Sequence, residues 1–331
     1  MLTFFLNSIN GKSDIENKHV SSVYALAKAA HPGSGFSDYF KQLKMMLRLF
    51  IFRNFHQQVK MIFTDRKLHV IALAHPRIYE KIYRTYMYHG ATIGERLVIL
   101  KSHYQFVSNV FSDLLIHSVY VSQNFMLCTV LVPNDNSLIT VRLAYRQRFE
   151  KEGELTLNLL DGNGRRLYSV SFSIDIRDGK PSVLIGCIIG PSVTESSNGE
   201  VIKNLTKGLH GMRPKNLLLF LLQTFCRELG IQNIFAIAAQ SHVYASSAKK
   251  LLRIKFDYDD FWEEVGGKRR DKLLFSLPLH YERHAYEEIR TNKRAAYARR
   301  YAVLEDIEMQ VHNALQAVSS GQSNDNGHLV V

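Results

Sequence analysis

The sequence is poor in the residues that cross-link a small secreted protein. Its 331 residues include only three cysteines, seven prolines and one tryptophan. Cys128, Cys187 and Cys226 are odd in number, far apart and surrounded by apolar residues. This pattern argues against a disulfide framework and against a CxxC metal site. We therefore expect three buried thiols.

Long apolar runs are also missing. The longest lies around residues 217–222 and is far shorter than the roughly 18 residues that a membrane helix needs. The first ten residues contain no Lys or Arg, so they do not resemble a secretory signal. Hydrophobic residues make up 46% and charged residues 22% of the chain, as in globular proteins. We expect a folded cytoplasmic protein that could also sit peripherally at the inner membrane.

Negative charge is in short supply. Lys and Arg number 42 against 30 Asp and Glu, which gives a net charge of +12. Residues 1–110 hold 15 of these cations and only 6 of the acids, so most of the excess lies in the first third. Such asymmetry predicts an anionic partner surface near the N-terminal region, such as phospholipid, nucleic acid or an acidic protein. A solvated basic helical face is the alternative.

The densest basic segment is residues 38–60. Its apolar residues, among them Leu43, Leu47 and Phe50, follow helical spacing, with Lys and Arg between them. A basic, aromatic amphipathic helix of this kind can contact an anionic membrane surface. The apolar stripe is broad, however, and a broad stripe favours a helix buried on two sides.

The order of patterns predicts an α+β fold. We expect a basic, mainly helical N-terminal region over residues 1–120, a mixed α+β domain over 121–318 and a disordered tail over 319–331. Hydrophobic and β-branched runs separated by turn residues predict an antiparallel meander with helices packed over it. The expected strands of the meander are 125–132, 137–145, 154–160, 166–175 and 182–190. Two later strands are expected at 233–239 and 271–279. Helices are expected at 199–209, 214–230 and 286–318, and a further one within 241–256.

A glycine-rich basic loop, TKGLHGMRPKN, precedes the most apolar helix. Its glycines permit close backbone approach, its cations attract anions, and Pro214 begins a helix whose free N–H groups point back at the loop. The spacing matches neither GxGxxG nor GxxxxGK[ST]. The residues expected to bind a phosphate or pyrophosphate group are Lys207, Gly208, Gly211, Arg213 and Lys215.

Several strings in the second half resemble a known family when taken in order. They are GRRLYSVSFSI, IGCIIGPS, TKGLHGMRPKNLLLF, SHVY, FDYDDFWEEVGG, LPL and KRAAYARRY, and together they are similar to the VirK/YbjX family of Gram-negative bacteria. The resemblance is specific over residues 164–301. It implies a factor in envelope integrity, surface localisation of virulence proteins, antimicrobial-peptide resistance or stress response, with envelope-biogenesis partners. It implies no catalytic residues.

The element order also resembles GNAT-type acyltransferases: a meander, a basic glycine loop opening a helix, a strand, a helix and a last strand. That resemblance implies acyl-CoA bound through the glycine loop. It places His242 and Tyr244 where a general acid or base would act. The loop lacks the pattern [QR]-x-x-G-x-[GA], and no Asn follows NIFAIAA. A packed polar strand end is the alternative interpretation of both residues.

Two further clusters carry weaker hypotheses. His280 and His284 are four residues apart but no HExxH motif is present, so we expect no metal. KRAAYARRY (293–301) could grip nucleic acid, yet no recognition motif accompanies it and flanking acids predict an ion-paired helix. Nucleic acid is thus the least favoured partner. The sequence indicates neither the oligomeric state nor whether the protein is an enzyme.

Overall fold

The computed structural model describes residues 23–132, 137–191, 198–245 and 258–319. Contacts along the chain form two compact units, Met1–Arg84 and Thr85–Val331. The connection between the first two expected strands, most of the helix expected within 241–256 and nearly all of the expected tail lie outside the described residues.

The first unit is helical. It contains a helix over residues 23–30, α3 (Phe36–Ile51), α4 (Arg53–Ile62), α5 (His69–Ala74) and the 3-10 helix η1 (Pro76–Tyr83). The single helix expected over residues 38–60 is broken at Phe52, whose φ of −104° and ψ of 38° are not helical. Ala27, Met45 and Leu49 form the centre of its hydrophobic core.

Helix α3 is buried on one face only. Met45 and Leu49 point into the core, whereas Phe36 and Phe50 are largely exposed. The expectation of burial on two sides is therefore wrong. The broad apolar stripe of α3 contains more residues than the described core takes up, so part of it stays exposed.

The second unit combines one open sheet with helices. The strands are β1 (Phe125–Val132), β2 (Ser137–Ala144), β3 (Leu155–Leu160), β4 (Arg166–Arg177), β5 (Lys180–Ile189), β6 (Asn233–Ile237), β7 (Lys268–Arg269) and β8 (Leu274–Leu277). Their order is β1-β2-β3-β4-β5-β6-β8-β7. All neighbours are antiparallel except β5 and β6, which are parallel. The expected α+β class is confirmed, and the seven expected strands are all present.

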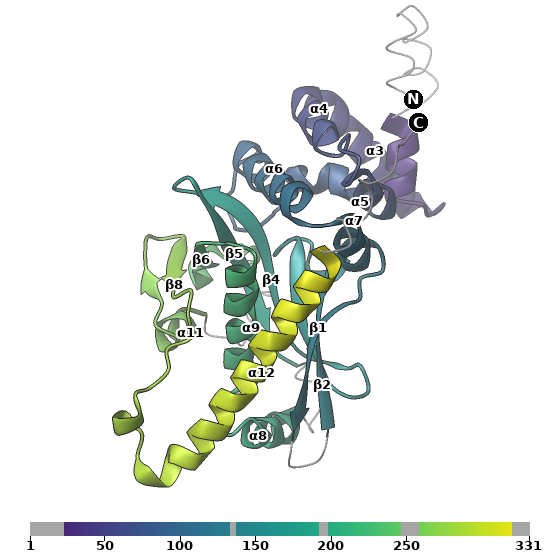
Figure 1. Ribbon diagram of the computed structural model, residues 1–331. Helices are drawn as coiled ribbons and strands as arrows, with labels where there is room; N and C mark the ends of the chain where they lie inside the picture. The colour runs from purple at the N-terminus through teal and green to yellow at the C-terminus, as the bar shows by residue number, and fades with distance from the viewer. Residues whose placement is uncertain (1–22, 133–136, 192–197, 246–257, 320–331) are drawn as a thin grey trace, which may run out of the picture. The chain divides into compact units, whose positions relative to one another are not determined.

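The second unit also contains helices, several of which pack on the sheet. They are α6 (Ile93–Val110), α7 (Asp113–Ile116), the π-helix η2 (His117–Val121), α8 (Asn198–Gly208), α9 (Pro214–Glu228), α11 (Tyr258–Glu264) and α12 (Arg294–Ser319). Helix α6 falls within the region expected to be N-terminal, but it packs against β4 in the second unit. Helices α9 and α12 lie side by side across one face of the sheet (Figure 1).

Strand β4 shows how alternation divides the two faces. Phe172 meets Phe225 of α9 with ring centroids 5.9 Å apart. The next residue, Ser173, bonds the Tyr86 hydroxyl at 2.9 Å. Successive side chains of a strand point to opposite faces, so α9 and residue 86 lie on different sides of β4.

All three cysteines are buried and free, as expected.

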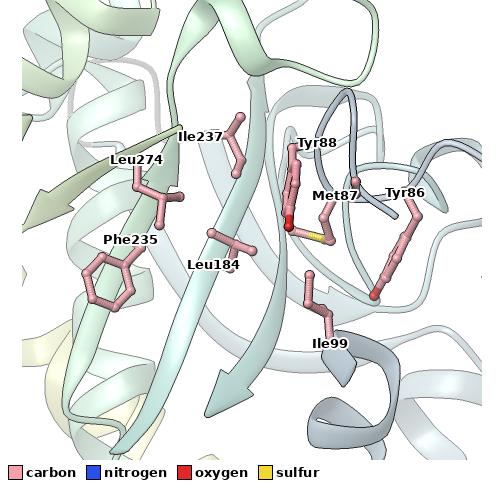
Figure 2. Close-up of a cluster of buried hydrophobic side chains, with 9 residues drawn as sticks. Tyr86, Met87, Tyr88, Ile99, Leu184, Phe235, Ile237 and Leu274 are labelled. Atoms are coloured by element: carbon pink, nitrogen blue, oxygen red, sulfur yellow. The ribbon is translucent and has the colours of Figure 1, made fainter. Parts of the chain in front are cut away.

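A short segment after the first unit covers β5, β6 and β8. Tyr86 to Tyr88, with Ile99 of α6, pack on Leu184, Phe235, Ile237 and Leu274 (Figure 2). The Met87 N–H then donates to the Lys151 carbonyl at 2.8 Å, and the His89 N–H donates to the Ser241 carbonyl at 2.8 Å. This segment therefore ties together the two loops that carry the candidate site.

Candidate active site

The candidate site lies where the two parallel strands stop pairing. Strand β5 pairs with β6 only from Ser182 with Asn233 to Ile185 with Ala236, although β5 runs on to Ile189. Helices α8 and α9 form the crossover between these strands. Ligands of open sheets bind at the carboxyl ends of parallel strands, where neighbouring connections separate. The geometry thus marks the ends of β5 and β6.

Gly186 allows a second segment to cross β5 at this point. The β4–β5 register shifts here, since Ser171 pairs with Cys187 and Phe172 with Ile185. A Cβ on Gly186 would lie 1.9 Å from the Glu152 carbonyl oxygen. Glycine is required because only its bare backbone lets residue 152 rest on the strand.

Glu152 is a buried carboxyl group with an unusual pKa. Its residue is 2% exposed, and burial raises its pKa to about 7. A hydrogen bond from the Tyr244 hydroxyl and the charge of Lys151 oppose this rise. Within the described residues, Oε2 of Glu152 is buried and has no hydrogen-bond partner. A buried unpaired carboxylate oxygen is costly, so the protein favours the protonated form of this group, in agreement with its raised pKa.

Tyr244 follows β6 and faces Glu152. Burial raises its pKa well above the usual value, and the nearby charge of Glu152 raises it further. The Lys151 ammonium lies 5.5 Å from the centre of the Tyr244 ring. Tyr244 is therefore a neutral hydroxyl donor at physiological pH, and its acceptor is the carboxyl group of Glu152.

His242 lies in the same loop as Tyr244 and accepts a hydrogen bond from its backbone. It is 3% exposed, and burial lowers its pKa to about 4, so the ring is neutral near pH 7. Its Nδ1 accepts a 3.4 Å hydrogen bond from the Tyr244 N–H. Nε2 has no hydrogen-bond partner in the described part of the chain. The structure thus brings the two expected acid or base residues together and adds Glu152, which sequence reasoning missed.

Helix α11 closes the site between the separating strands. Tyr258 stacks on His242 at 5.3 Å with an interplanar angle of 20°, and its hydroxyl donates to the Ile188 carbonyl at 3.0 Å. Trp262 Nε1 donates to the Ile237 carbonyl at 3.2 Å. Helix α11 therefore satisfies one carbonyl at the end of each parallel strand. The aromatic content of FDYDDFW was the only sequence signal for this role.

The glycine loop differs from an open phosphate cradle. Lys207 and Gly208 belong to the last turn of α8. His210 and Gly211 have φ values of 51° and 85°, and their N–H groups donate to the carbonyls of Lys207 and Thr206. These left-handed residues end the helix in a Schellman-type turn. The loop amides are thus used within the protein, and an anion would depend on cationic side chains and the first turn of α9.

Cations do gather around this turn. Arg213 and Lys215 each bond Glu264 of α11 at 2.8 Å. From α12, Arg300 donates to the His210 carbonyl at 2.7 Å. Burial, together with the charges of Arg299 and Arg300, lowers the pKa of His210. The cationic part of KRAAYARRY therefore lies beside the glycine loop, which its sequence position did not reveal. We call Arg213, Lys215, Arg299 and Arg300 the basic cluster.

Helix α11 also connects the basic cluster to the loop that carries His242 and Tyr244. Glu264 at its end contacts Arg213 and Lys215, and Tyr258 at its start stacks on His242. Six residues of α-helix separate these points by about 9 Å.

The remaining expected sites contribute nothing to this geometry. His280 and His284 precede α12 in a segment that is not helical, so they do not share a helical face. In the described ranges, no cluster of three or more His, Cys, Asp or Glu side chains could hold a metal ion. Among the helices of the same ranges, none has the length and apolarity needed to cross a membrane.

Comparisons with known proteins identify relatives over most of the chain. The family model described as "Protein of unknown function (DUF535)" matches residues 35–313. The Escherichia coli K12 protein named "Uncharacterized protein YbjX" is 29% identical over 246 residues, which cover 74% of each chain. A Haemophilus influenzae protein is 34% identical over 165 residues, or 48% of this chain and 52% of its own. No solved structure matches the chain.

Proposed function

Since this chain belongs to the DUF535 family, which includes YbjX, we propose that its second unit transfers an acyl group from a CoA thioester to an amine. The acceptor we propose is an amine of a bacterial envelope component. This choice joins the envelope role that the VirK/YbjX resemblance implies with the chemistry of the candidate site.

The observation that carries the proposal is the Glu152–Tyr244 pair. A carboxyl group with a pKa of about 7 is partly charged at neutral pH, so it can accept a proton from an attacking amine. The neutral Tyr244 hydroxyl beside it can donate one. A buried carboxyl group and a half-buried hydroxyl that lie together with raised pKa values are typical of an active site.

The topology supports the same reaction class. The meander, the glycine loop that opens α9, the parallel strand β6 and the later strand β8 follow the order that the acyltransferase resemblance implies, whereas the short edge strand β7 has no counterpart in it. The strands β5 and β6 stop pairing beside the Glu152–Tyr244 pair, and α9 begins next to the basic cluster. This is a fold-level analogy, and the site residues supply the chemical argument.

In the proposed reaction the amine nitrogen attacks the thioester carbonyl carbon. A C–N bond forms and the C–S bond breaks, so the acyl group passes to nitrogen and CoA leaves as a thiolate. The Glu152 carboxylate takes the proton that the nitrogen loses, and the Tyr244 hydroxyl gives its proton to the thiolate. A proton then passes from the Glu152 carboxyl group to the Tyr244 phenolate along their hydrogen bond, which restores both groups to their starting forms.

His242 takes a positioning role in this proposal. Its pKa of about 4 makes it a poor proton acceptor near pH 7, and its Nδ1 instead accepts a hydrogen bond from the backbone N–H of Tyr244.

The basic cluster would receive the phosphates of CoA once Glu264 releases Arg213 and Lys215. Arginine guanidinium groups suit phosphate because they form paired hydrogen bonds with it.

Calorimetric titration with CoA and with acetyl-CoA tests the cofactor part of the proposal. We expect binding by the unmodified protein and weaker binding by Arg213→Ala. Arg165→Ala is the matched control, because Arg165 is an exposed arginine that pairs with Asp161 in the β3–β4 turn. The absence of binding heat with either ligand, or equal weakening by both variants, would reject the CoA site.

A further inference from the structure

Helix α3 presents a continuous apolar stripe on the side that faces away from the core of the first unit. The stripe residues follow a four-three-four-three spacing, which keeps them on one helical face. They are Phe36, Phe40, Leu43, Leu47 and Phe50, with exposed fractions of 89%, 62%, 39%, 43% and 70%. Met45 and Leu49 on the opposite face are fully buried. Among the described residues, the stripe thus lies outside the core cluster that Met45 and Leu49 join.

One edge of this stripe is basic. At 100° per residue, Lys44, Arg48 and Lys41 follow each other beside the stripe, between it and the buried face. The only acid in α3, Asp38, bonds Lys41 at 2.9 Å. Helix α4 adds Arg53 and Lys60 and no acid. A long apolar stripe thus lies next to a row of cations.

We propose that the apolar stripe of α3 lies in the interface of an anionic phospholipid bilayer. A surface of large exposed apolar side chains marks an interaction site, and the adjoining cations indicate the charge of the partner. Phenylalanine and leucine side chains would enter the acyl boundary while Lys41, Lys44 and Arg48 meet lipid phosphates. The 16 residues of α3 span about 24 Å, which is long enough for interfacial binding along the helix axis.

Three occupants other than lipid are distinguishable by experiment. They are residues 1–22 of the same chain, a second copy of the protein, and an acidic protein partner. Charge complementarity favours the bilayer, because its phosphates form a continuous anionic plane beside an apolar layer. Neither of the two occupants made of this chain offers an excess of negative charge, since the chain itself is basic.

Co-sedimentation of the full-length protein with vesicles tests the proposal. We expect binding to phosphatidylcholine vesicles that contain phosphatidylglycerol, weak binding to phosphatidylcholine alone, and release by added salt. Phe40→Ser should weaken binding about tenfold or more, because it removes an aromatic ring that the proposal places in the acyl boundary of the bilayer. The control Leu73→Ser changes an equally exposed apolar residue outside the stripe and should have little effect.

The charge edge has its own pair of variants. Lys44→Gln should weaken binding to the anionic vesicles about fivefold. Lys268→Gln, which removes an exposed lysine from β7, should leave it within error. All the altered residues are exposed, and circular dichroism with calorimetric CoA titration will confirm that the variants remain folded.

Several results would overturn the proposal. They are no sedimentation with either vesicle type, equal loss in the stripe and control variants, and vesicle binding that requires deletion of residues 1–22. A dimer in the absence of lipid that Phe40→Ser converts to a monomer would assign the stripe to a second copy. Capture of an acidic polypeptide in place of vesicles would assign it to a protein.

Discussion

Replacement of Glu152 by glutamine should change the stability of the second unit in a pH-dependent way. The folded protein raises the pKa of this carboxyl group from 4.5 to about 7. The folded state therefore holds a proton that the unfolded state has already released between these pH values. The free energy of unfolding decreases with rising pH wherever the folded state binds more protons than the unfolded state. Stability is therefore lost as pH rises from about 4.5 to 7.

The magnitude follows from the shift. Each pKa unit corresponds to about 1.4 kcal/mol, so the charged form of Glu152 costs roughly 3 kcal/mol at pH 8. Glutamine is uncharged and similar in shape, and its carbonyl can still accept the hydrogen bond from Tyr244. We expect Glu152→Gln to be roughly 3 kcal/mol more stable than the unmodified protein at pH 8 and nearly equal to it at pH 4.5.

Urea denaturation at the two pH values measures this difference. Trp262 is the only tryptophan in the sequence and is fully buried in the second unit, so its fluorescence reports the unfolding of that unit. Glu287→Gln alters an exposed glutamate and should show no pH-dependent change. A stability difference for Glu152→Gln that is the same at both pH values would refute the reasoning.

Three further predictions concern the same site. The kcat/KM for acyl transfer should rise with pH through about 7, because the proposed base must be charged, and a pH–rate profile of Glu152→Gln should lack this rise. Tyr258→Phe should lower the free energy of unfolding by about 1–3 kcal/mol in urea denaturation, because it removes the buried hydrogen bond from the Tyr258 hydroxyl to the Ile188 carbonyl. Unchanged stability would contradict the closing role of α11. Gly186→Ala should destabilise the protein by about 3 kcal/mol in thermal or chemical unfolding, since its Cβ would clash with the Glu152 carbonyl. The control is Gly94→Ala in α6, whose Cβ would meet only Thr92 Oγ1 at 4.0 Å. This control should be tolerated in the same assay.

Regular local patterns made the sheet predictable. The meander strands combine period-two hydrophobicity with turn residues, and the structure confirms them to within a few residues. Asp178 and Gly179, for example, adopt the positive φ values that their hairpin requires, 53° and 71°. Local signals also marked the start of α9, where Pro214 is the first residue, and its end before Gly230, whose φ is 68°.

Features set by tertiary contacts were not predictable in the same way. The break between α3 and α4 falls at Phe52, where no glycine or proline gives a signal. The Schellman-type turn at Gly211 follows from how α8 ends, and two glycines alone do not distinguish that turn from an anion cradle. The breadth of the apolar stripe in α3 suggested burial on two sides. The sequence does not contain the information needed to test this, because burial depends on which other elements pack around the helix.

The candidate site shows the same division. Tyr244 and His242 were identified because they directly follow a strand in a familiar element order. Glu152 was missed because its burial depends on a crossing of β5 at Gly186, and nothing near residue 152 indicates that crossing. The acids at 150, 152 and 154, which alternate just before β3 and are all buried, were the one available signal. Arg299 and Arg300 reach the glycine loop only because α12 folds back beside α9.

The central claim is that the Glu152–Tyr244 pair transfers an acyl group, and thiol release from acyl-CoA tests it most directly. The unmodified protein should liberate CoA thiol from acetyl-CoA or longer acyl-CoA in the presence of an amine such as phosphatidylethanolamine or a lysine peptide. Tyr244→Phe and Glu152→Gln should each slow this release by about 100-fold or more, while Glu287→Gln should not. Thiol release at the background rate with every acyl chain and amine, or at equal rates in all four proteins, would contradict the account.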